Sequence, residues 1–315
     1  MTITEDCITG AIVVIAKCPI EGASKTRLAA SGSFAPQHCH QIARAMLCDV
    51  IRHLSFCPYL ADKTKVMKVL MYAPGNEEGY CIMSGILEDL GLMDEWNLRP
   101  MFHSATKEEM RSSNLGEILN DALQVVKGLL ETEEKSENCG VVYLGMDSPE
   151  LPVLEIANAL WLSQHGTALL CPANDGGYGL LGIPTNIDVN KNIFAGVRWS
   201  DPLTAVSQLK VLSDCGLNVK LGQMMNDIDE YSDLLKLANK LCYDKNKSIR
   251  MNPVESPKLI CVSSSKNVDV LSHYSVNVSN FDLPHFSCNC DKTWECLLEI
   301  GVVKLCDGVY RTMQK

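Results

Sequence analysis

Short apolar runs alternate along this chain with longer stretches in which apolar residues recur at helical spacing. The first run, AIVVIA at Ala11–Ala16, is β-branched and has the length of a buried strand. The stretch at Pro36–Leu54, PQHCHQIARAMLCDVIRHL, has helical spacing and begins with proline, which is typical of a helix start. Because this alternation continues to Leu241, the pattern predicts an α/β fold with a mostly parallel sheet covered by helices on both faces.

The same two periodicities predict the individual elements. Strands are expected at 11–16, 65–72, 99–103, 141–144, 167–170, 179–183 and 219–221. Helices are expected at 36–54, 77–92, 114–130, 150–162, 202–215 and 230–241.

The composition of the chain changes after Tyr243. Residues 244–258, DKNKSIRMNPVESPK, are polar, lack periodicity and contain two prolines, so they predict a linker. The segment 259–315 includes one expected helix at 292–300 and is too short for a large core of its own. We therefore expect a main domain at 1–243 and a small C-terminal appendage at 259–315, whose role the sequence does not indicate.

Charge and composition limit the class of protein. The formal net charge of -10 argues against non-specific binding to nucleic acid or to an anionic membrane. The N-terminus MTITEDCITG lacks the pattern of a signal peptide and no apolar run is long enough to cross a membrane, so we expect a cytoplasmic protein. The fifteen scattered cysteines are expected to be free thiols. Formation of a homo-oligomer is left open.

Polar clusters follow four of the predicted strands, at the ends where open α/β sheets bind ligands. The clusters are KCPIEGASKTRL at 17–28, GMDSPE at 145–150, CPANDGGY at 171–178 and NDID at 226–229. Lysine and arginine neutralise phosphate oxygens, glycine lets backbone amides approach a phosphate closely, and paired acids can hold Mg²⁺. Two of the clusters also have a structural interpretation, because Asp147 could be a helix N-cap and Gly176-Gly177 could be a simple turn.

Six motifs occur in a fixed order along the chain. They are KxPxxGxxKTRL, NLGE, GxDSPEL, DGGYxLLGI, FxGxxWS and DIDxxxDL. From Ala11 to Leu241 the series resembles a bacterial-type family with the nucleotide-diphospho-sugar transferase (GT-A) fold, some members of which are described as glycosyltransferases of arsenosugar biosynthesis. The first motif also resembles that of 2-phospholactate guanylyltransferase. Asn114 departs from the family pattern, which usually has an acid there, and the C-terminal appendage has no counterpart in it.

The resemblance implies roles for residues of the strand-end clusters. The residues implied around the nucleotide are Gly22, Lys25, Thr26, Arg27, Gly176 and Gly177, with the last two on the acceptor or sugar side. Asp147 would be the first metal-ligating acid, and Asp229 or Asp227 the second. The residues implied in catalysis are Asp147, Lys25 and Asp175, the last to orient or deprotonate the acceptor hydroxyl.

The activity implied by the resemblance is that of a glycosyltransferase-like enzyme dependent on Mg²⁺ or Mn²⁺. It would use a nucleoside-diphosphate sugar and a small-molecule acceptor. One alternative is a guanylyltransferase-like nucleotidyltransferase that releases pyrophosphate, and another is a non-catalytic regulator that binds a nucleotide. The two acids favour an enzyme over a regulator, because binding alone does not require both.

Overall fold

The computed structural model describes residues 9–57, 60, 66–101, 115–132, 139–187, 192–251, 290–306 and 309–313. Its strands are β1 (Gly10–Lys17), β2 (Val66–Ala73), β3 (Asn97–Pro100), β4 (Gly140–Gly145), β5 (Thr167–Pro172), β6 (Tyr178–Pro184), β7 (Asn218–Leu221), β8 (Val303–Cys306) and β9 (Val309–Thr312). Its helices are α1 (Thr26–Ala30), α2 (Pro36–Phe56), α3 (Glu77–Asp89), the 3-10 helix η2 (Met93–Glu95), α5 (Leu115–Thr132), α6 (Val153–Gln164), α7 (Thr204–Asp214), α8 (Tyr231–Met251) and α9 (Asp291–Glu299).

Seven strands form one sheet in the order β3-β2-β1-β4-β6-β5-β7. Strand β6 runs antiparallel to its neighbours β4 and β5, and the other adjacent pairs run parallel. Strands β8 and β9 form a separate antiparallel hairpin. The predicted α/β class with a mostly parallel sheet is therefore confirmed.

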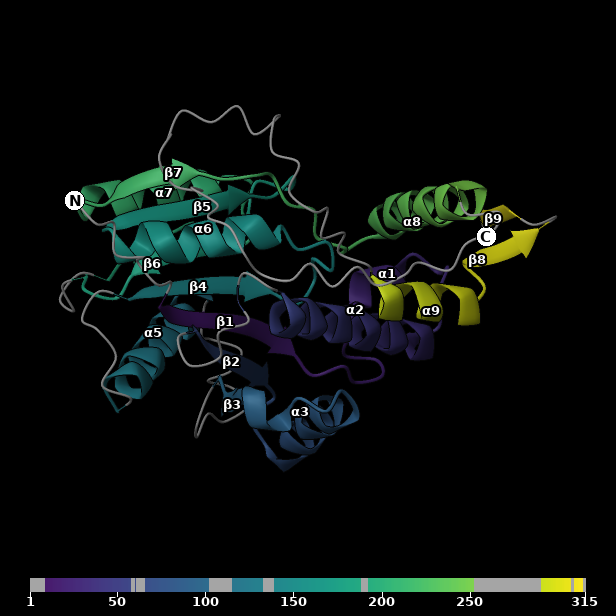
Figure 1. Ribbon diagram of the computed structural model, residues 1–315, viewed down its shortest axis with the longest axis horizontal. Helices are drawn as coiled ribbons and strands as arrows, with labels where there is room; N and C mark the ends of the chain where they lie inside the picture. The colour runs from purple at the N-terminus through teal and green to yellow at the C-terminus, as the bar shows by residue number, and fades with distance from the viewer. Residues whose placement is uncertain are drawn as a thin grey trace, which may run out of the picture.

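Helices cover both faces of the sheet (Figure 1). Ile12 and Val14 of β1 pack in one core with residues of α2, α3 and α6, whereas Ala11 and Val13 pack in a second core with residues of α5 and α7. Successive side chains of a strand point to opposite faces, so a strand buried on both sides must be apolar throughout. This requirement explains the uninterrupted apolar run that predicted β1.

A third core lies near the end of β1, where α8, α9 and the β8–β9 hairpin lie beside α1 and α2 (Figure 1). It joins Leu28 of α1, Met46 of α2, Leu237 of α8 and Trp294 of α9, all of them buried. The described part of the predicted appendage thus shares a core with the main domain. Helix α8 also continues through residues 244–251, which were predicted as the first part of a linker, and residues 252–289 lie outside the described ones.

Asp49 joins α2 to α9. Its Oδ1 accepts the backbone N–H of Lys292 at 2.9 Å, and its Oδ2 accepts that of Thr293 at 2.7 Å. The first amides of a helix have no partner inside the helix, so a buried acid of α2 satisfies two amides of α9. Asn246 of α8 likewise exchanges two hydrogen bonds with the backbone of Tyr310 in β9. Specific polar contacts therefore hold the C-terminal elements against α2 and α8.

Two expectations about the class of protein can be compared with this structure. None of the helices that the structure describes combines the length and apolar character needed to span a bilayer. The cysteines in the described part of the chain are free thiols, most of them buried. Cys18 belongs to the first polar cluster, at 17–28. Burial raises the pKa of its thiol to about 12, so this thiol is not a nucleophile at neutral pH.

Candidate active site

The loop after β1 turns back on itself before α1. The hydroxyl of Ser24 closes this turn, because it donates to the carbonyl of Cys18 at 3.1 Å and accepts the N–H of Ile20 at 2.8 Å. Gly22 lies in the turn with φ +75°, and a Cβ there would meet nothing within 4 Å, so glycine is required for its backbone conformation and not for space. Lys25 also has a left-handed backbone, with φ 49°, which is unusual for a residue with a side chain.

Lys25 brings two of the predicted metal-binding acids together. Its Nζ lies 2.6 Å from Oδ1 of Asp147 and 3.2 Å from Oδ1 of Asp229, and it donates to the carbonyl of Ile228 at 2.5 Å. The side chain of Lys25 is only 6% exposed, whereas both carboxylates are partly exposed. Two hydrogen bonds and a close ion pair therefore surround the ammonium. Residues from three separate loops thus converge at one end of the sheet, as the sequence predicted they would.

The helix-cap interpretation of Asp147 is wrong. Helix α6 begins at Val153, and the residue at its cap position is Pro152. The carbonyl of Asp147 accepts the N–H of Ile228 at 2.9 Å, which ties the loop after β4 to the segment before α8. Its carboxylate pairs with Lys25 and serves no helix terminus.

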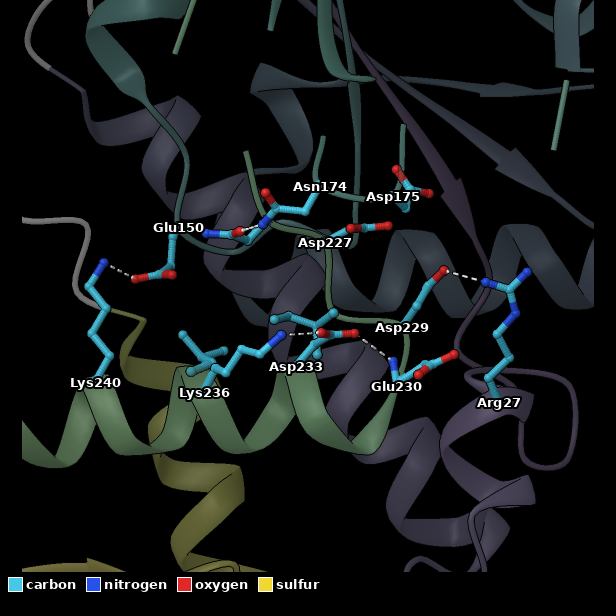
Figure 2. Close-up of a pocket in the computed structure, with 13 residues that line it drawn as sticks. Arg27, Glu150, Asn174, Asp175, Asp227, Asp229, Glu230, Asp233, Lys236 and Lys240 are labelled. Carbon is cyan, nitrogen blue, oxygen red and sulfur yellow. Dashed lines mark hydrogen bonds and ion pairs between the residues drawn. The ribbon is translucent and has the colours of Figure 1, made fainter. Parts of the chain in front are cut away.

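A cleft of about 440 Å³ opens beside this ion cluster. Figure 2 shows Arg27 and Asp229 at one end of the cleft, with Asp175 above Asp229, then Asp227, and Glu150 and Lys240 at the other end. The acids in the lining outnumber the cations: they are Glu150, Asp175, Asp227, Asp229, Glu230 and Asp233, against Arg27, Lys236 and Lys240. Four of these acids, Asp175, Asp227, Asp229 and Glu230, lie toward Arg27 (Figure 2), where they would repel a polyphosphate unless a divalent cation accompanied it. At the other end of the cleft, Lys236 and Lys240 balance the charges of Asp233 and Glu150.

Of the first polar cluster, at 17–28, Arg27 is the one residue in the described lining of the cleft. It is exposed, and its Nη1 lies 3.0 Å from Oδ2 of Asp229. Thr26 is exposed at the first position of α1. The described lining of the cleft does not include Gly22, Lys25 or Thr26. Lys25 contacts the cleft indirectly, through its ion pair with Asp229 in the lining.

Asp175 lies on the loop between β5 and β6 and faces the cleft (Figure 2). Its Oδ1 accepts the N–H of Gly177 at 2.8 Å, which closes a local Asx-type turn. Gly176 has φ +89°, and a Cβ there would lie 2.0 Å from the carbonyl oxygen of Pro202. Both glycines therefore serve the turn and its close packing, and neither is among the described residues that line the cleft.

The NDID segment before α8 presents two acids to the cleft. Ile228 is buried in the third core, and Asp227 and Asp229 on either side of it line the cleft. Burial raises the pKa of the Asp227 carboxyl, and the negative charges of Asp175 and Asp229 raise it further. Asp229 pairs with Lys25 and Arg27, whereas Asp227 lies beside Asp175 (Figure 2).

The carboxylates of Asp147 and Asp229 fit a hard divalent ion such as Mg²⁺. Both approach a single point, the nitrogen of Lys25, within 3.2 Å. Among the described residues, no group of three or more His, Cys, Asp or Glu side chains could hold a metal ion. Mg²⁺ commonly takes only one or two protein carboxylates and completes its shell with water and substrate phosphates. The pair therefore suits an ion that arrives with a nucleotide.

The sequence interpretation missed the wall of the cleft that α8 supplies. Lys236, Leu237 and Lys240 lie in this wall, facing Glu150 and Asn174 from other loops. The spacing of the two lysines on the predicted helix at 230–241 places them on one face, and this spacing could have indicated the wall.

Comparisons with known proteins agree with this architecture. A family described as uncharacterized proteins conserved in bacteria (DUF2064) matches residues 64–201. A crystal structure from Desulfovibrio desulfuricans G20, described as a candidate nucleotide-diphospho-sugar transferase, superposes with a TM-score of 0.59 and 23% identity over 76% of this chain and 90% of that one. The chain has the nucleotide-diphospho-sugar transferase fold.

A second solved structure is less similar to the chain. The 4-diphosphocytidyl-2C-methyl-D-erythritol synthase of Anaerococcus prevotii has a TM-score of 0.44 and 9% identity over 76% of this chain and 99% of that one. Comparison with curated proteins gives no match. The activities implied by the resemblance to arsenosugar glycosyltransferases and to 2-phospholactate guanylyltransferase therefore stay predictions.

Proposed function

We propose that this protein is a Mg²⁺-dependent transferase that moves a sugar from a nucleoside-diphosphate donor to a small-molecule acceptor. The observation that carries the proposal is the convergence of Asp147 and Asp229 on Lys25 beside the cleft. Open α/β sheets bind ligands at the carboxyl ends of their strands, which is where these residues lie. The fold shared with the Desulfovibrio protein supports a nucleotide sugar as the donor.

Asp147 and Asp229 would hold the metal ion, and Arg27 would contact the donor phosphates. When bound, the ion neutralises charge on the diphosphate, including the charge that develops as it leaves. Arg27 is exposed and paired with one acid, so a phosphate can reach its remaining donors. Lys25 would turn from the carboxylates toward the phosphates, or share its donors between them.

The transfer forms one bond and breaks another. The oxygen of the acceptor hydroxyl bonds to the anomeric carbon of the sugar, and the bond between that carbon and the diphosphate oxygen breaks. The nucleoside diphosphate leaves with the bonding electron pair, and the hydroxyl proton passes to a carboxylate of the cleft. Asp175 is our candidate for this carboxylate, because it lines the cleft on a loop fixed by its own Asx turn.

Nucleotide binding tests the proposal. Thermal unfolding of the full chain would be followed with a panel of nucleotides and nucleotide sugars, each with Mg²⁺, with Mn²⁺ and with EDTA. We expect stabilisation by nucleoside diphosphates and their sugars only in the presence of metal, because the cleft carries an excess of acids. A profile that does not depend on metal across the whole panel contradicts the proposal.

A matched pair of arginine variants sharpens this test. Arg27→Ala should weaken nucleotide binding about tenfold, because it removes charge-assisted hydrogen bonds to phosphate. Arg44→Ala is the control, since Arg44 is also an exposed arginine paired with one acid, Asp89 at 2.6 Å, and is not part of the described lining. Equal nucleotide affinity in the two variants contradicts the phosphate role of Arg27.

Product analysis then identifies the reaction. Release of a free nucleoside diphosphate supports sugar transfer, and release of pyrophosphate assigns nucleotidyl transfer instead. Metal-dependent binding with neither product, tested across a broad panel of acceptors, assigns a non-catalytic regulator.

A further inference from the structure

The α8 end of the cleft has a chemical character different from that of the metal end. Lys236 and Lys240 are four residues apart and therefore extend from one face of α8, and both line the cleft. Figure 2 shows Lys236 directed toward Asp233 and Lys240 toward Glu150. Leu237, on the same face, is buried in the third core, so this part of α8 is fixed in position.

Each of these lysines has an ion-pair partner that a ligand could join or replace. Nζ of Lys240 lies 2.5 Å from Oε1 of Glu150, and Nζ of Lys236 lies 3.2 Å from Oδ1 of Asp233. An ammonium has three donors, so a single ion pair does not exhaust it. The side chains of Lys236 and Lys240 are 77% and 60% exposed, and such exposed pairs are screened by water and exchange readily.

Two amides lie in the opposite wall of the cleft. Nδ2 of Asn174, on the loop between β5 and β6, donates to Oδ1 of Asn226, in the segment before α8. Both side chains are exposed, and each amide carries donors as well as an acceptor. This chemistry suits the hydroxyl groups of a polar ligand.

We propose that this end of the cleft is an acceptor subsite for a small hydroxylated anion. Lys236 and Lys240 hold its carboxylate or phosphate group, and Asn174 and Asn226 contact its hydroxyl groups. The subsite rests on the proposed function, because it presents an acceptor hydroxyl toward Asp175. It also keeps the acceptor anion at the end of the cleft opposite Arg27, so that two anionic ligands can occupy one cleft without close repulsion (Figure 2).

Isothermal titration of the full chain with three probes tests this subsite. The probes are glycerate and glycerol 3-phosphate, which are anionic, and glycerol, which is their neutral counterpart. Each is titrated into protein alone and into protein saturated with Mg²⁺ and a nucleoside diphosphate. We expect both anionic probes to bind at least about tenfold more tightly than glycerol, because charge-assisted hydrogen bonds are stronger than neutral ones.

A double variant and a matched control locate the preference for anions. Lys236→Gln/Lys240→Gln should lose the preference, whereas Lys210→Gln should keep it. Lys210 is likewise exposed and paired with an acid, Asp214 at 2.5 Å, but it belongs to α7 and is not in the described lining. The proposal is overturned by equal binding of anionic and neutral probes, by a preference that survives in the double variant, or by no detectable binding of any probe at millimolar concentration.

The same titrations separate this proposal from the proposed function. Wild-type protein that shows no metal-dependent nucleotide binding contradicts the proposed function, and the probe titrations without nucleotide still decide the subsite. Wild-type protein that binds nucleotide but shows no preference for anions overturns the subsite alone.

Discussion

The ammonium of Lys25 lies 2.6 Å from Oδ1 of Asp147, in an ion pair whose lysine is buried and whose aspartate is partly exposed. Asp229 meets the same nitrogen at 3.2 Å. Two carboxylates of like charge this close would repel each other without a cation between them. Lys25 thus holds the acids together before any ligand binds, and under the proposed function it would share them with the metal ion.

Lys25→Met tests this double role. The substitution removes the charge and keeps much of the apolar stem, so the two carboxylates lose their internal cation. We expect affinity for Mg²⁺ alone to rise, and affinity for nucleotide in the presence of Mg²⁺ to fall about tenfold as a phosphate contact is lost. Isothermal titration with Mg²⁺ and then with nucleotide measures both effects, with Lys210→Met as the control. An unchanged nucleotide affinity would show that Lys25 acts only on the carboxylates.

Asp147→Asn should abolish metal-dependent nucleotide binding and leave the fold intact. Its ion pair is partly exposed, so we expect the free energy of unfolding to change by less than about 1 kcal/mol. Asp201→Ala is the contrasting variant, because Oδ1 of Asp201 accepts the N–H of Leu203 beside α7 and alanine removes this acceptor. That change should lower stability by about 1 kcal/mol without affecting metal binding. If Asp147→Asn instead lowers stability and keeps metal affinity, the metal binds elsewhere.

Gly176→Ala should destabilise the protein more than Gly196→Ala. Both glycines have left-handed backbones, with φ +89° and φ +80°, so alanine at either position costs roughly 1–2 kcal/mol of strain. Only at Gly176 would the new Cβ also lie 2.0 Å from the carbonyl oxygen of Pro202, whereas at Gly196 it meets nothing within 4 Å. Denaturant unfolding measures the difference. Equal losses of unfolding free energy in the two variants would show that the loop between β5 and β6 can move away from Pro202.

Asp49→Ala should destabilise the C-terminal elements. It leaves the amides of Lys292 and Thr293 without their acceptor in a buried place, at a cost of about 1–3 kcal/mol for each unsatisfied group. Hydrogen exchange should become faster in α9 and in α8, which shares its core. Asp89→Ala removes an exposed acid and should change stability by less than about 0.5 kcal/mol. Unchanged hydrogen exchange in α9 after Asp49→Ala would show that the two hydrogen bonds to Asp49 do not stabilise this helix.

Much of the fold could be predicted from local pattern because its central strands are buried on both faces. The runs of β1, β2 and β4 are apolar apart from Lys68 and the terminal Lys17, and these strands lie within two residues of their predicted bounds. Three short elements were not predicted. Helix α1 has five residues, β8 has four and the 3-10 helix η2 has three, which is too few for a periodicity to show. The polar C-terminal part of α8 was predicted as a linker because its own sequence has no helical periodicity. Contacts with distant residues stabilise the helix there, among them the hydrogen bonds of Asn246 to Tyr310.

The candidate site could be predicted only as a set of strand ends. The loops of Lys25 and Asp147 lie close because β1 and β4 are parallel neighbours. Asp229 follows the edge strand β7, and it reaches them because the segment before α8 runs back to the loop after β4, where the N–H of Ile228 donates to the carbonyl of Asp147. The direction of the Lys25 side chain does not follow, since it depends on a left-handed backbone that no local signal announces. The cleft wall on α8 depends on the third core, which forms from residues at both ends of the chain.

The contact between Asp49 and the amides of α9 joins positions 243 and 244 residues apart, and this separation has a consequence for biosynthesis. During translation α2 leaves the ribosome long before α9, so the third core, which contains Ile42 and Met46, is completed only when the end of the chain has been made. An incomplete product that stops before residue 290 lacks Trp294 and Leu297 of this core and leaves part of the apolar face exposed. Such products are the ones that chaperones would have to retain and that would aggregate first.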